Sequence, residues 1–258
     1  MHPVDGASIS VLKFGGSVLC NRSALAGVAT EVARFRRTGR AVLAVVSALQ
    51  GRTDALLAEC AHVSPPLSPL AVAARVASGE RECAAMLAEA LSVEGLDAAV
   101  LDPAALQLLA EGDPLDADPV GVSLPRCLAA LGRSGVAVVP GFVAVDGSGN
   151  AVLLGRGGSD LTALFLAQRL AAHCRLVKDV DGLFQADPAD GPAAGRVAFS
   201  DYAELLLTGG RLVQAKAVAF AAQHQLVFEI GSLGSHAVTR IGPPGTSQRG
   251  PSTTSTAG

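Results

Sequence analysis

The chain has few aromatic residues and lacks the usual patterns of disulfide and metal sites. Its 258 residues include no tryptophan, one tyrosine and eight phenylalanines, although 50% of the residues are hydrophobic. The five cysteines are scattered without a C-x-x-C pair, and the five histidines form neither H-x-x-x-H nor H-E-x-x-H. We therefore expect a core of alanine, valine and leucine, reduced thiols, and no metal site made by protein side chains.

Charge and hydropathy argue against two further classes of protein. The formal net charge is −3 and no basic stripe is present, which argues against a nucleic-acid surface. Arg34, Arg36, Arg37 and Arg40 gather at the end of an expected helix, and interaction with the helix C-terminus accounts for them. Every apolar run is too short to span a bilayer, and the N-terminus lacks a signal-peptide pattern. We expect a cytoplasmic protein that binds neither nucleic acid nor membrane.

Strand and helix patterns alternate along the chain. Ala41 to Ser47 and Val136 to Pro140 are continuous apolar runs, typical of buried parallel strands. The remaining patterns predict strands at 9–12, 97–101, 142–145, 151–154, 174–180 and 226–230, and helices at 23–37, 53–62, 70–91, 124–131, 161–173, 200–207 and 213–223. Residues 146–150 predict a hairpin turn, and residues 102–122 look irregular. This order predicts a mostly parallel sheet covered on both faces.

A glycine-rich turn separates an apolar run from a helical pattern in the sequence LLGRGGSDLTA, residues 153–163. Backbone N–H groups at such a turn can bind an anion, because glycine allows close approach of the ligand. Arg156 adds a planar guanidinium suited to a carboxylate or a phosphate. The simpler alternative is a strand-to-helix turn that happens to be rich in glycine.

A second glycine loop, KFGGS at residues 13–17, follows the first expected strand. Lys13 is a candidate phosphate contact there; the alternative is a strand-end lysine whose charged head reaches solvent. Neither loop matches the Walker A pattern or the dinucleotide fingerprint. Both are expected at the carboxyl ends of strands, where parallel sheets bind their ligands.

Further short motifs complete an ordered set: VVSA at 45–48 with Thr53 and Asp54, Gly79-Glu80, Gly141-Phe142, DVDG at 179–182 and ADP at 186–188. With the two glycine loops, this set resembles aspartokinases of the amino acid kinase superfamily, from about residue 9 to 232. The resemblance implies an α/β, three-layer αβα sandwich with a mostly parallel central sheet, as in carbamate kinase. It implies a kinase domain over 1–242, with an amino-acid-binding half at about 9–140 and an ATP-binding half at about 141–242. Residues 243–258 are expected to form a disordered tail.

The resemblance assigns site residues by position. Lys13 and Asp160 are the catalytic pair, with Lys13 on the transferring phosphoryl group. The expected nucleotide-binding residues are Gly15, Gly16, Ser17, Gly157, Gly158, Lys178, Asp179, Phe184, Asp187 and Arg211. The expected substrate-binding residues are Ser47, Thr53, Glu80, Arg156 and Ser159. Without the resemblance, Glu80 would be assigned to a solvated helix face and Asp160 to a helix N-cap.

The implied reaction is ATP-dependent phosphorylation of the side-chain carboxylate of L-aspartate to 4-phospho-L-aspartate. A carboxylate with a pKa near about 4 is already ionised, so the reaction needs no general base. Mg²⁺ is expected to be held mainly by phosphates and water. A homodimer is also implied. The sequence ends where aspartokinases usually begin their ACT regulatory domains, so we expect no feedback inhibition by lysine or threonine through this chain; a separate regulatory partner remains open.

Three departures from the family pattern leave alternatives open. The first loop is one residue shorter than usual, Ala189 stands where arginine is usual, and Arg211 replaces a lysine that helps to hold the nucleotide. The chain is alternatively a kinase for another small amino acid or carboxylic acid in a specialised pathway. A third reading is a catalytically weak homologue that binds nucleotide or amino acid and acts through a partner protein.

Overall fold

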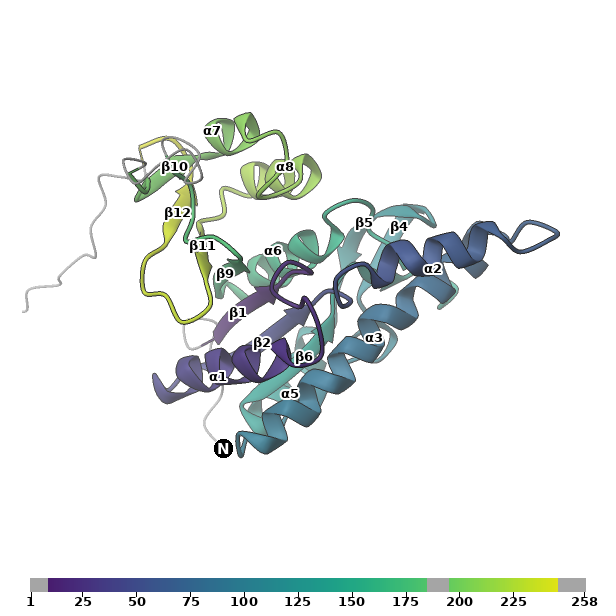
Figure 1. Ribbon diagram of the computed structural model, residues 1–258, viewed down its shortest axis with the longest axis horizontal. Helices are drawn as coiled ribbons and strands as arrows, with labels where there is room; N and C mark the ends of the chain where they lie inside the picture. The colour runs from purple at the N-terminus through teal and green to yellow at the C-terminus, as the bar shows by residue number, and fades with distance from the viewer. Residues whose placement is uncertain (1–8, 185–194, 246–258) are drawn as a thin grey trace, which may run out of the picture.

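The computed structural model describes residues 9–184 and 195–245, and its centre is an eight-stranded sheet (Figure 1). The strand order is β10-β12-β11-β9-β1-β2-β6-β3, and every pairing is parallel except that of β11 with β12. The strands are β1 (Ile9–Phe14), β2 (Ala41–Val46), β3 (Ala99–Val100), β6 (Val136–Pro140), β9 (His173–Lys178), β10 (Phe199–Asp201), β11 (Phe228–Ser232) and β12 (Thr239–Gly242). The predicted α/β class with a mostly parallel sheet is confirmed.

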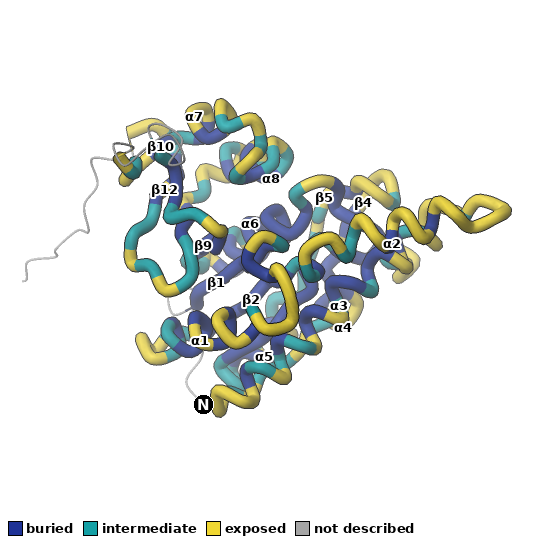
Figure 2. The backbone as a smooth tube through the Cα atoms, viewed as in Figure 1, coloured by how far each residue is buried: buried dark blue, intermediate teal, exposed yellow. Residues whose placement is uncertain are grey.

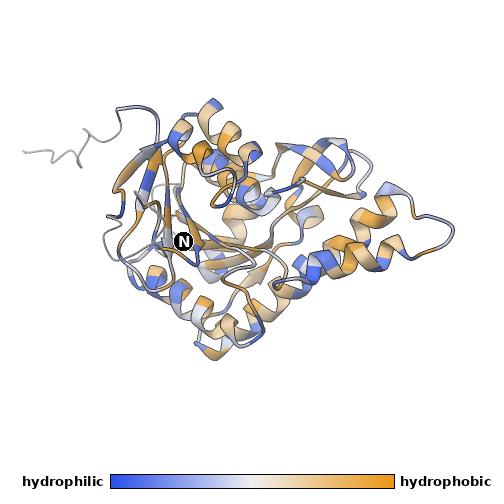
Figure 3. Cartoon of the chain, turned by 45° about the horizontal axis from the view of Figure 1, so that its top comes forward, coloured by the Kyte–Doolittle hydropathy of each residue, from blue (hydrophilic) through white to orange (hydrophobic). Residues whose placement is uncertain are grey.

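Helices cover both faces of this sheet because successive strand residues point to opposite sides. Val11 and Leu43 pack on the face covered by α5 (Leu124–Ser134), α6 (Gly158–Leu170) and α8 (Ala215–Gln223). Leu12 and Phe14 pack on the other face, against α1 (Ala24–Arg37) and α3 (Pro69–Val93). Helices cover both faces, which explains why β1, β2 and β6 are buried along their whole length (Figure 2). The strands at the centre of the molecule are mainly hydrophobic (Figure 3).

A smaller sheet stands beside the first, with strand order β5-β4-β7-β8. Its strands are β4 (Leu109–Asp113), β5 (Asp116–Gly121), β7 (Val143–Val145) and β8 (Ala151–Leu153). Leu56 of α2 (Arg52–Ala61) and Val76 of α3 pack against Val143 and Leu153 in a separate core. The predicted β7–β8 hairpin is confirmed, with the Asp146 side chain accepting from the backbone N–H of Ser148 at 2.9 Å.

The prediction that residues 102–122 are irregular is wrong. They form α4 (Pro103–Leu106) and the β4–β5 hairpin. The strand sequences LAEGD and DADPVG are polar and hold a glycine and a proline, which strands usually avoid. Pairing of Leu109 with Val145 attaches the hairpin to β7, so a tertiary contact overrides the local preference.

The remaining differences concern element ends and short strands. Pro69 begins α3, one residue before the predicted start at Leu70, and the Ser68 side chain accepts from Ala71 N at 3.2 Å. β9 begins at His173, which was expected to end a helix. β10 and β12 were not predicted, since three- and four-residue strands carry too few residues for a periodic signal. The helix α7 (Tyr202–Leu207) lies near its expected place. Among the described residues, no helix has the length and apolarity that a membrane span requires.

Candidate active site

A cleft of about 620 Å³ lies where the two glycine loops meet, at the carboxyl ends of β1 and β2. Its volume falls in the range of small-molecule sites, roughly 300 to 1,000 Å³. The loop after β1, the segment after β2, α3 and the start of α6 all contribute to its walls. The predicted site residues that line it are Lys13, Gly16, Ser17, Ser47, Thr53, Glu80, Arg156, Gly157, Gly158, Ser159 and Asp160.

A buried carboxylate between two lysines forms one wall of the cleft. Lys13 Nζ lies 2.7 Å from Asp160 Oδ1, and Lys178 Nζ lies 2.8 Å from Asp160 Oδ2. Strand alternation explains the meeting: Lys13 follows Val11 and Lys178 follows Leu176 by two residues, so both lysines face the side covered by α6. A solvent-reaching Lys13 is therefore excluded, since only 5% of the residue is exposed.

Burial sets the protonation of this cluster. Desolvation, opposed by Asp160 and assisted by Lys178, lowers the pKa of Lys13 to about 8. Burial alone would raise the pKa of Asp160, but the charges of Lys13 and Lys178 outweigh it and hold the pKa below its usual value. Asp160 is therefore ionised near neutral pH, and Lys13, which lines the cleft, stays mostly protonated below its pKa of about 8.

The second glycine loop positions Asp160 without using it as a cap. Gly157 is the N-cap of α6 and has φ +79°, a conformation that glycine adopts at little cost. A Cβ on Gly158 would lie 2.6 Å from Phe142 Cδ2 and 3.0 Å from Leu154 Cβ, so this close approach also requires glycine. The N-cap interpretation of Asp160 is wrong. The loop follows β8 of the smaller sheet, so only the first glycine loop lies at the end of a central strand.

Glu80 is buried rather than solvated, with 2% of its surface exposed. Its Oε1 accepts weak hydrogen bonds from Ala48 N and Thr53 Oγ1, each at 3.4 Å. Its Oε2 is buried without a hydrogen-bond partner among the described residues. Burial raises the pKa of Glu80 to about 7 despite these contacts. The adjacent Gly79 lets α3 approach this closely, because a Cβ there would lie 3.2 Å from that of Ala48.

Polar side chains connect the two walls of the cleft. Ser47 Oγ donates to Ser159 Oγ at 3.0 Å, which joins the end of β2 to the first turn of α6. Arg156 is exposed at the cleft and has no ion-pair partner among the described residues. An unpaired guanidinium and a buried carboxylate with a free oxygen therefore line the same cavity.

The predicted nucleotide-binding residues lie in different surroundings. Gly15 is buried beside Lys13, and its added Cβ would lie 2.8 Å from Lys13 Nζ. Asp179 is exposed after β9, and Phe184 forms an isolated bridge with Arg196. Arg211 is exposed, donates to Thr208 O at 3.2 Å and does not line the cleft. Asp187, with Ala189 beyond it, lies outside the described residues.

Sequence reasoning missed a contact that attaches the β4–β5 hairpin to α8. Lys216 Nζ lies 2.7 Å from Asp116 Oδ1 and 3.1 Å from Asp118 Oδ1. Leu115, at the tip of the same hairpin, lines the cleft. The DADP sequence was noted as irregular, and no local pattern links it to a lysine 100 residues away. Gly141-Phe142 was noted as a motif without a role; the Thr162 hydroxyl accepts from Phe142 N at 3.1 Å.

No group of three or more histidine, cysteine, aspartate or glutamate side chains capable of holding a metal ion occurs in the described ranges. Both oxygens of Asp160 are occupied by lysine ammonium groups. A metal ion entering this cleft would therefore depend on ligands supplied by a bound molecule and by water.

The sequence is similar to known kinases. A family model described as the amino acid kinase family matches residues 8–230. The aspartokinase of Pseudomonas aeruginosa is 32% identical over 227 residues, which cover 86% of this chain and 55% of that protein. The aspartokinase of Mycolicibacterium smegmatis is 30% identical over 230 residues, covering 87% and 55% respectively. The chain thus spans about half the length of the curated relatives it matches.

Solved structures share the fold. Aspartokinase III of E. coli superposes with a TM-score of 0.78 at 22% identity, covering 91% of this chain and 65% of that chain. Aspartate kinase from Synechocystis gives 0.76 at 28% identity, covering 91% and 40%. An isopentenyl phosphate kinase gives 0.65 at 18% identity, covering 90% and 100%. These proteins are named for different phosphoryl acceptors, so the fold by itself leaves the acceptor open.

Proposed function

The chain belongs to the amino acid kinase family, and from that membership we propose that it transfers the γ-phosphoryl group of ATP to the side-chain carboxylate of L-aspartate, forming 4-phospho-L-aspartate. The relatives named aspartokinase support the choice of acceptor. The observation that carries the proposal is a single cleft lined by Lys13, Asp160 and Glu80. Asp160 pairs there with Lys13 and, behind the wall, with Lys178, and Glu80 keeps one buried oxygen without a partner among the described residues.

The lysine cluster supports the phosphoryl-transfer half of the reaction. Phosphoryl transfer depends on positioning and on neutralising charge that spreads over the phosphoryl oxygens. Lys13 and Lys178 supply two ammonium groups, and Asp160 fixes both in place. The backbone N–H groups of the loop at Gly15 and Gly16 and the N-terminus of α6 add further anion-binding donors.

Glu80 and Arg156 support an α-amino acid as the acceptor. The buried Oε2 of Glu80 lacks a partner, and a substrate ammonium group would satisfy it. Arg156 offers a guanidinium fork for the substrate α-carboxylate. Ser47, Thr53 and Ser159 complete the proposed substrate set beside them.

The reacting carboxylate requires no base. An aspartate side chain with a pKa near about 4 is ionised at neutral pH. The protein therefore has to hold this oxygen in line with the γ-phosphorus and to exclude water, tasks for Arg156, Glu80 and the Ser47–Ser159 contact. Lys13, which stays protonated below its pKa of about 8, stabilises the charge that builds up on the transferring group.

ATP is proposed to bind as its Mg²⁺ complex. The ion would neutralise phosphate charge, and its ligands would be phosphate oxygens and water, since the donor set of the described residues offers no cage. We assign residues 141–242 to the nucleotide and 9–140 mainly to the amino acid. Lys178, Asp179, Phe184, Asp187 and Arg211 are proposed to border the nucleotide.

The test is ATP-dependent acyl-hydroxamate formation by the purified chain with Mg²⁺ and hydroxylamine. Aspartate, glutamate and other small acids are supplied in parallel, because hydroxylamine traps any acyl phosphate. Signal with aspartate and little with the others supports the proposal. Signal with another acid points to a kinase of a different pathway. Measurable ATP binding without signal points to a catalytically weak homologue acting through a partner.

A homodimer is proposed on family grounds, with a separate regulatory partner as a further possibility. The end of α2 and the start of α3 project from the body and expose Val63 and Leu70 (Figures 1 and 2). Light scattering after size exclusion decides between a mass near the chain's 25.9 kDa and twice that value. A monomer at micromolar concentration would contradict the dimer.

A further inference from the structure

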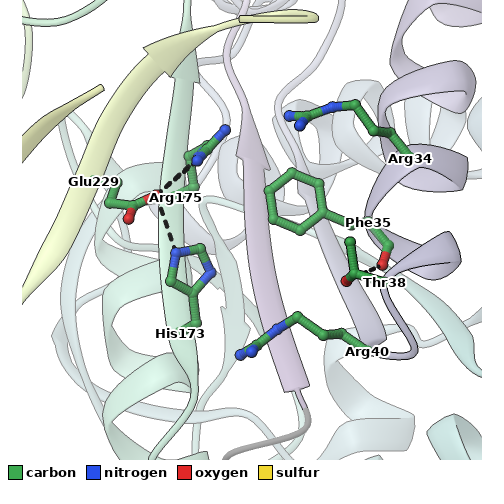
Figure 4. A pocket seen from close by; sticks show the side chains of 7 residues that line it. All are labelled: Arg34, Phe35, Thr38, Arg40, His173, Arg175 and Glu229. Atoms are coloured by element: carbon green, nitrogen blue, oxygen red, sulfur yellow. Dashed lines mark hydrogen bonds and ion pairs between the residues drawn. The ribbon is translucent and has the colours of Figure 1, made fainter. Parts of the chain in front are cut away.

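A second cavity, of about 340 Å³, lies between α1, β9 and β11 (Figure 4). Its position is set by the amino ends of the central strands: Arg40 directly precedes β2, and His173 is the first residue of β9. The catalytic cleft is at the opposite edge, where β1 and β9 end near Lys13 and Lys178. The lining residues are Arg34, Phe35, Thr38, Arg40, His173, Arg175 and Glu229.

Two of the three arginines in this basic cavity are already neutralised. Arg34 pairs with the buried Glu31, its Nε donating to Oε2 at 2.9 Å. Arg175 donates through Nε and Nη2 to Glu229 Oε2, at 3.0 and 2.8 Å. Each of these guanidinium groups therefore has a carboxylate of its own.

Arg40 is different, because its hydrogen-bond partners are neutral. Its Nε donates to Ser10 Oγ at 2.6 Å and its Nη2 to the Ile9 carbonyl at 2.8 Å. No carboxylate pairs with it among the described residues. The C-terminus of α1 does not account for it either, since its guanidinium is held by β1. Counting Arg34, Arg40 and Arg175 against Glu31 and Glu229, the cavity keeps one uncompensated positive charge.

The carboxylate of Glu229 is held in its charged form. Burial alone would raise the pKa of Glu229, but His173, whose Nε2 lies 3.1 Å away, and Arg175 lower it to about 2. Glu229 is thus committed to these two partners at any ordinary pH. His173 Nδ1 is buried without a hydrogen-bond partner in the described part of the chain, which leaves one wall of the cavity polar and unsatisfied.

An aromatic ring sits among these charges. The guanidinium carbons of Arg34 and Arg175 lie 4.9 and 5.1 Å from the centroid of Phe35. The His173 ring is stacked at 6.1 Å from the same centroid. Figure 4 shows Phe35 reaching from α1 toward β9, with Arg40 below it. The cavity therefore combines an apolar contact with one arginine, Arg40, that has no carboxylate partner among the described residues, an arrangement suited to an organic anion.

We propose that this cavity binds a small organic anion, with its carboxylate or phosphate group on Arg40 and its apolar body beside Phe35. The site is distinct from the catalytic cleft and does not depend on the reaction proposed above. Arg40 is bonded to Ser10 of β1, the strand that also carries Lys13. Ser10 and Lys13 are three residues apart, about 10 Å at the usual strand rise, so a molecule bound at Arg40 does not touch the catalytic lysine.

Calorimetric titration of the full chain with benzoate, phenyl phosphate and neutral benzamide tests the proposal. We expect one-to-one binding of at least one anion and none of benzamide, and the better anion identifies the preferred head group. Arg40→Gln should weaken that binding at least about tenfold, because a charge-assisted hydrogen bond is lost. Arg40→Lys, which keeps the charge, should weaken it less and serves as the deciding variant where Arg40→Gln fails to fold.

Two controls separate this site from others. Arg126→Gln removes an arginine that donates to the Ala105 carbonyl at 2.7 Å and does not line this cavity, so it should leave anion binding unchanged. Lys13→Ala should also leave it unchanged, since the catalytic cleft is elsewhere. Absence of anion binding, equal affinity for benzamide, full affinity in both Arg40 variants, or loss of binding in Lys13→Ala would each overturn the proposal.

Discussion

At the scale of single residues, the candidate site is defined by charges that the protein buries and then leaves partly unpaired. Asp160 is shared by two lysines, and Glu80 keeps one oxygen without a partner. Buried polar groups are normally satisfied within a protein, so such exceptions mark places where a ligand completes the set. The family resemblance identified both residues, whereas their local patterns predicted a solvated helix face and a helix N-cap. Their burial and pairing follow from the meeting of strands and helices far apart in the chain.

Lys13→Ala should lower kcat in the hydroxamate assay by a factor on the order of 10² to 10³, because a preorganised cation that stabilises the transferring group is removed. Lys13→Arg should recover only part of the activity, since the guanidinium is larger and its geometry differs. Lys216→Ala is a matched control, as Lys216 bonds the β4–β5 hairpin instead of Asp160. Comparable losses in Lys13→Ala and Lys216→Ala would refute the assignment of Lys13.

Glu80→Gln should stabilise the protein above neutral pH while raising the KM for aspartate. The pKa of Glu80 is about 7 in the folded chain, and its ordinary value of 4.5 applies to the unfolded chain. The folded state therefore holds this proton more tightly, and the free energy of unfolding falls as pH rises from about 4.5 to 7. The difference is on the order of 3 kcal/mol. Glutamine stays neutral, so Glu80→Gln should raise the free energy of unfolding at pH 8 and leave it nearly unchanged at pH 4.

Urea unfolding at the two pH values measures this effect. Glu82→Gln is the control, because Glu82 lies on the same helix with 58% of its side chain exposed. It should change stability little at either pH. An equal gain from Glu80→Gln at pH 4 and pH 8 would contradict a raised pKa as its cause.

At the scale of elements, the start of α6 is held by close packing against the end of β6. A Cβ on Gly141 would lie 2.9 Å from Ser159 Cβ, 2.9 Å from Val45 Cγ1 and 3.0 Å from Val46 O. Gly141→Ala should therefore displace the first turn of α6, which carries Asp160. We expect a loss of roughly 1 to 3 kcal/mol in the free energy of unfolding and a reduced kcat.

Gly147→Ala is the matched control for this substitution, since nothing lies within 4 Å of a Cβ at that hairpin position and its φ is not positive. Thermal unfolding and the hydroxamate assay should report no comparable change. Wild-type kcat in a folded Gly141→Ala variant would show that the position of α6 is less critical than the packing suggests.

Elements with a strong periodic signal were predicted, and those stabilised by distant contacts were not. The apolar runs of β2 and β6 are buried on both faces, so their sequences carry the information locally. The β4–β5 hairpin is polar and owes its pairing to β7 and to Lys216 of α8. Likewise, the motif set named the five expected substrate-binding residues, all of which line the cleft, whereas the predicted Arg211 does not. The cavity around Arg40 combines α1, β9 and β11, which no local pattern connects.

At the scale of the whole molecule, α3 joins the two sheets and carries Glu80 at their junction. Its first half packs through Ala73 and Val76 in the core of the smaller sheet. Its second half packs through Cys83 and Leu87 in the core of the larger sheet. Because Glu80 lies between these halves, a bound amino acid would contact the helix on which both sheets pack.

Ligand binding should therefore stabilise the whole chain. A non-hydrolysable MgATP analogue and L-aspartate, each at about 100 times its Kd, should each add about 2.7 kcal/mol to the free energy of unfolding, or roughly 5 to 10 °C in Tm.

Arg156→Lys should abolish most of the stabilisation by aspartate, since the bidentate contact with the α-carboxylate is lost. The same variant should keep the nucleotide increment, because the lysine cluster is untouched. Differential scanning calorimetry measures both increments. A full aspartate increment in Arg156→Lys would remove Arg156 from the substrate site, and loss of both increments would indicate a general effect on the cleft.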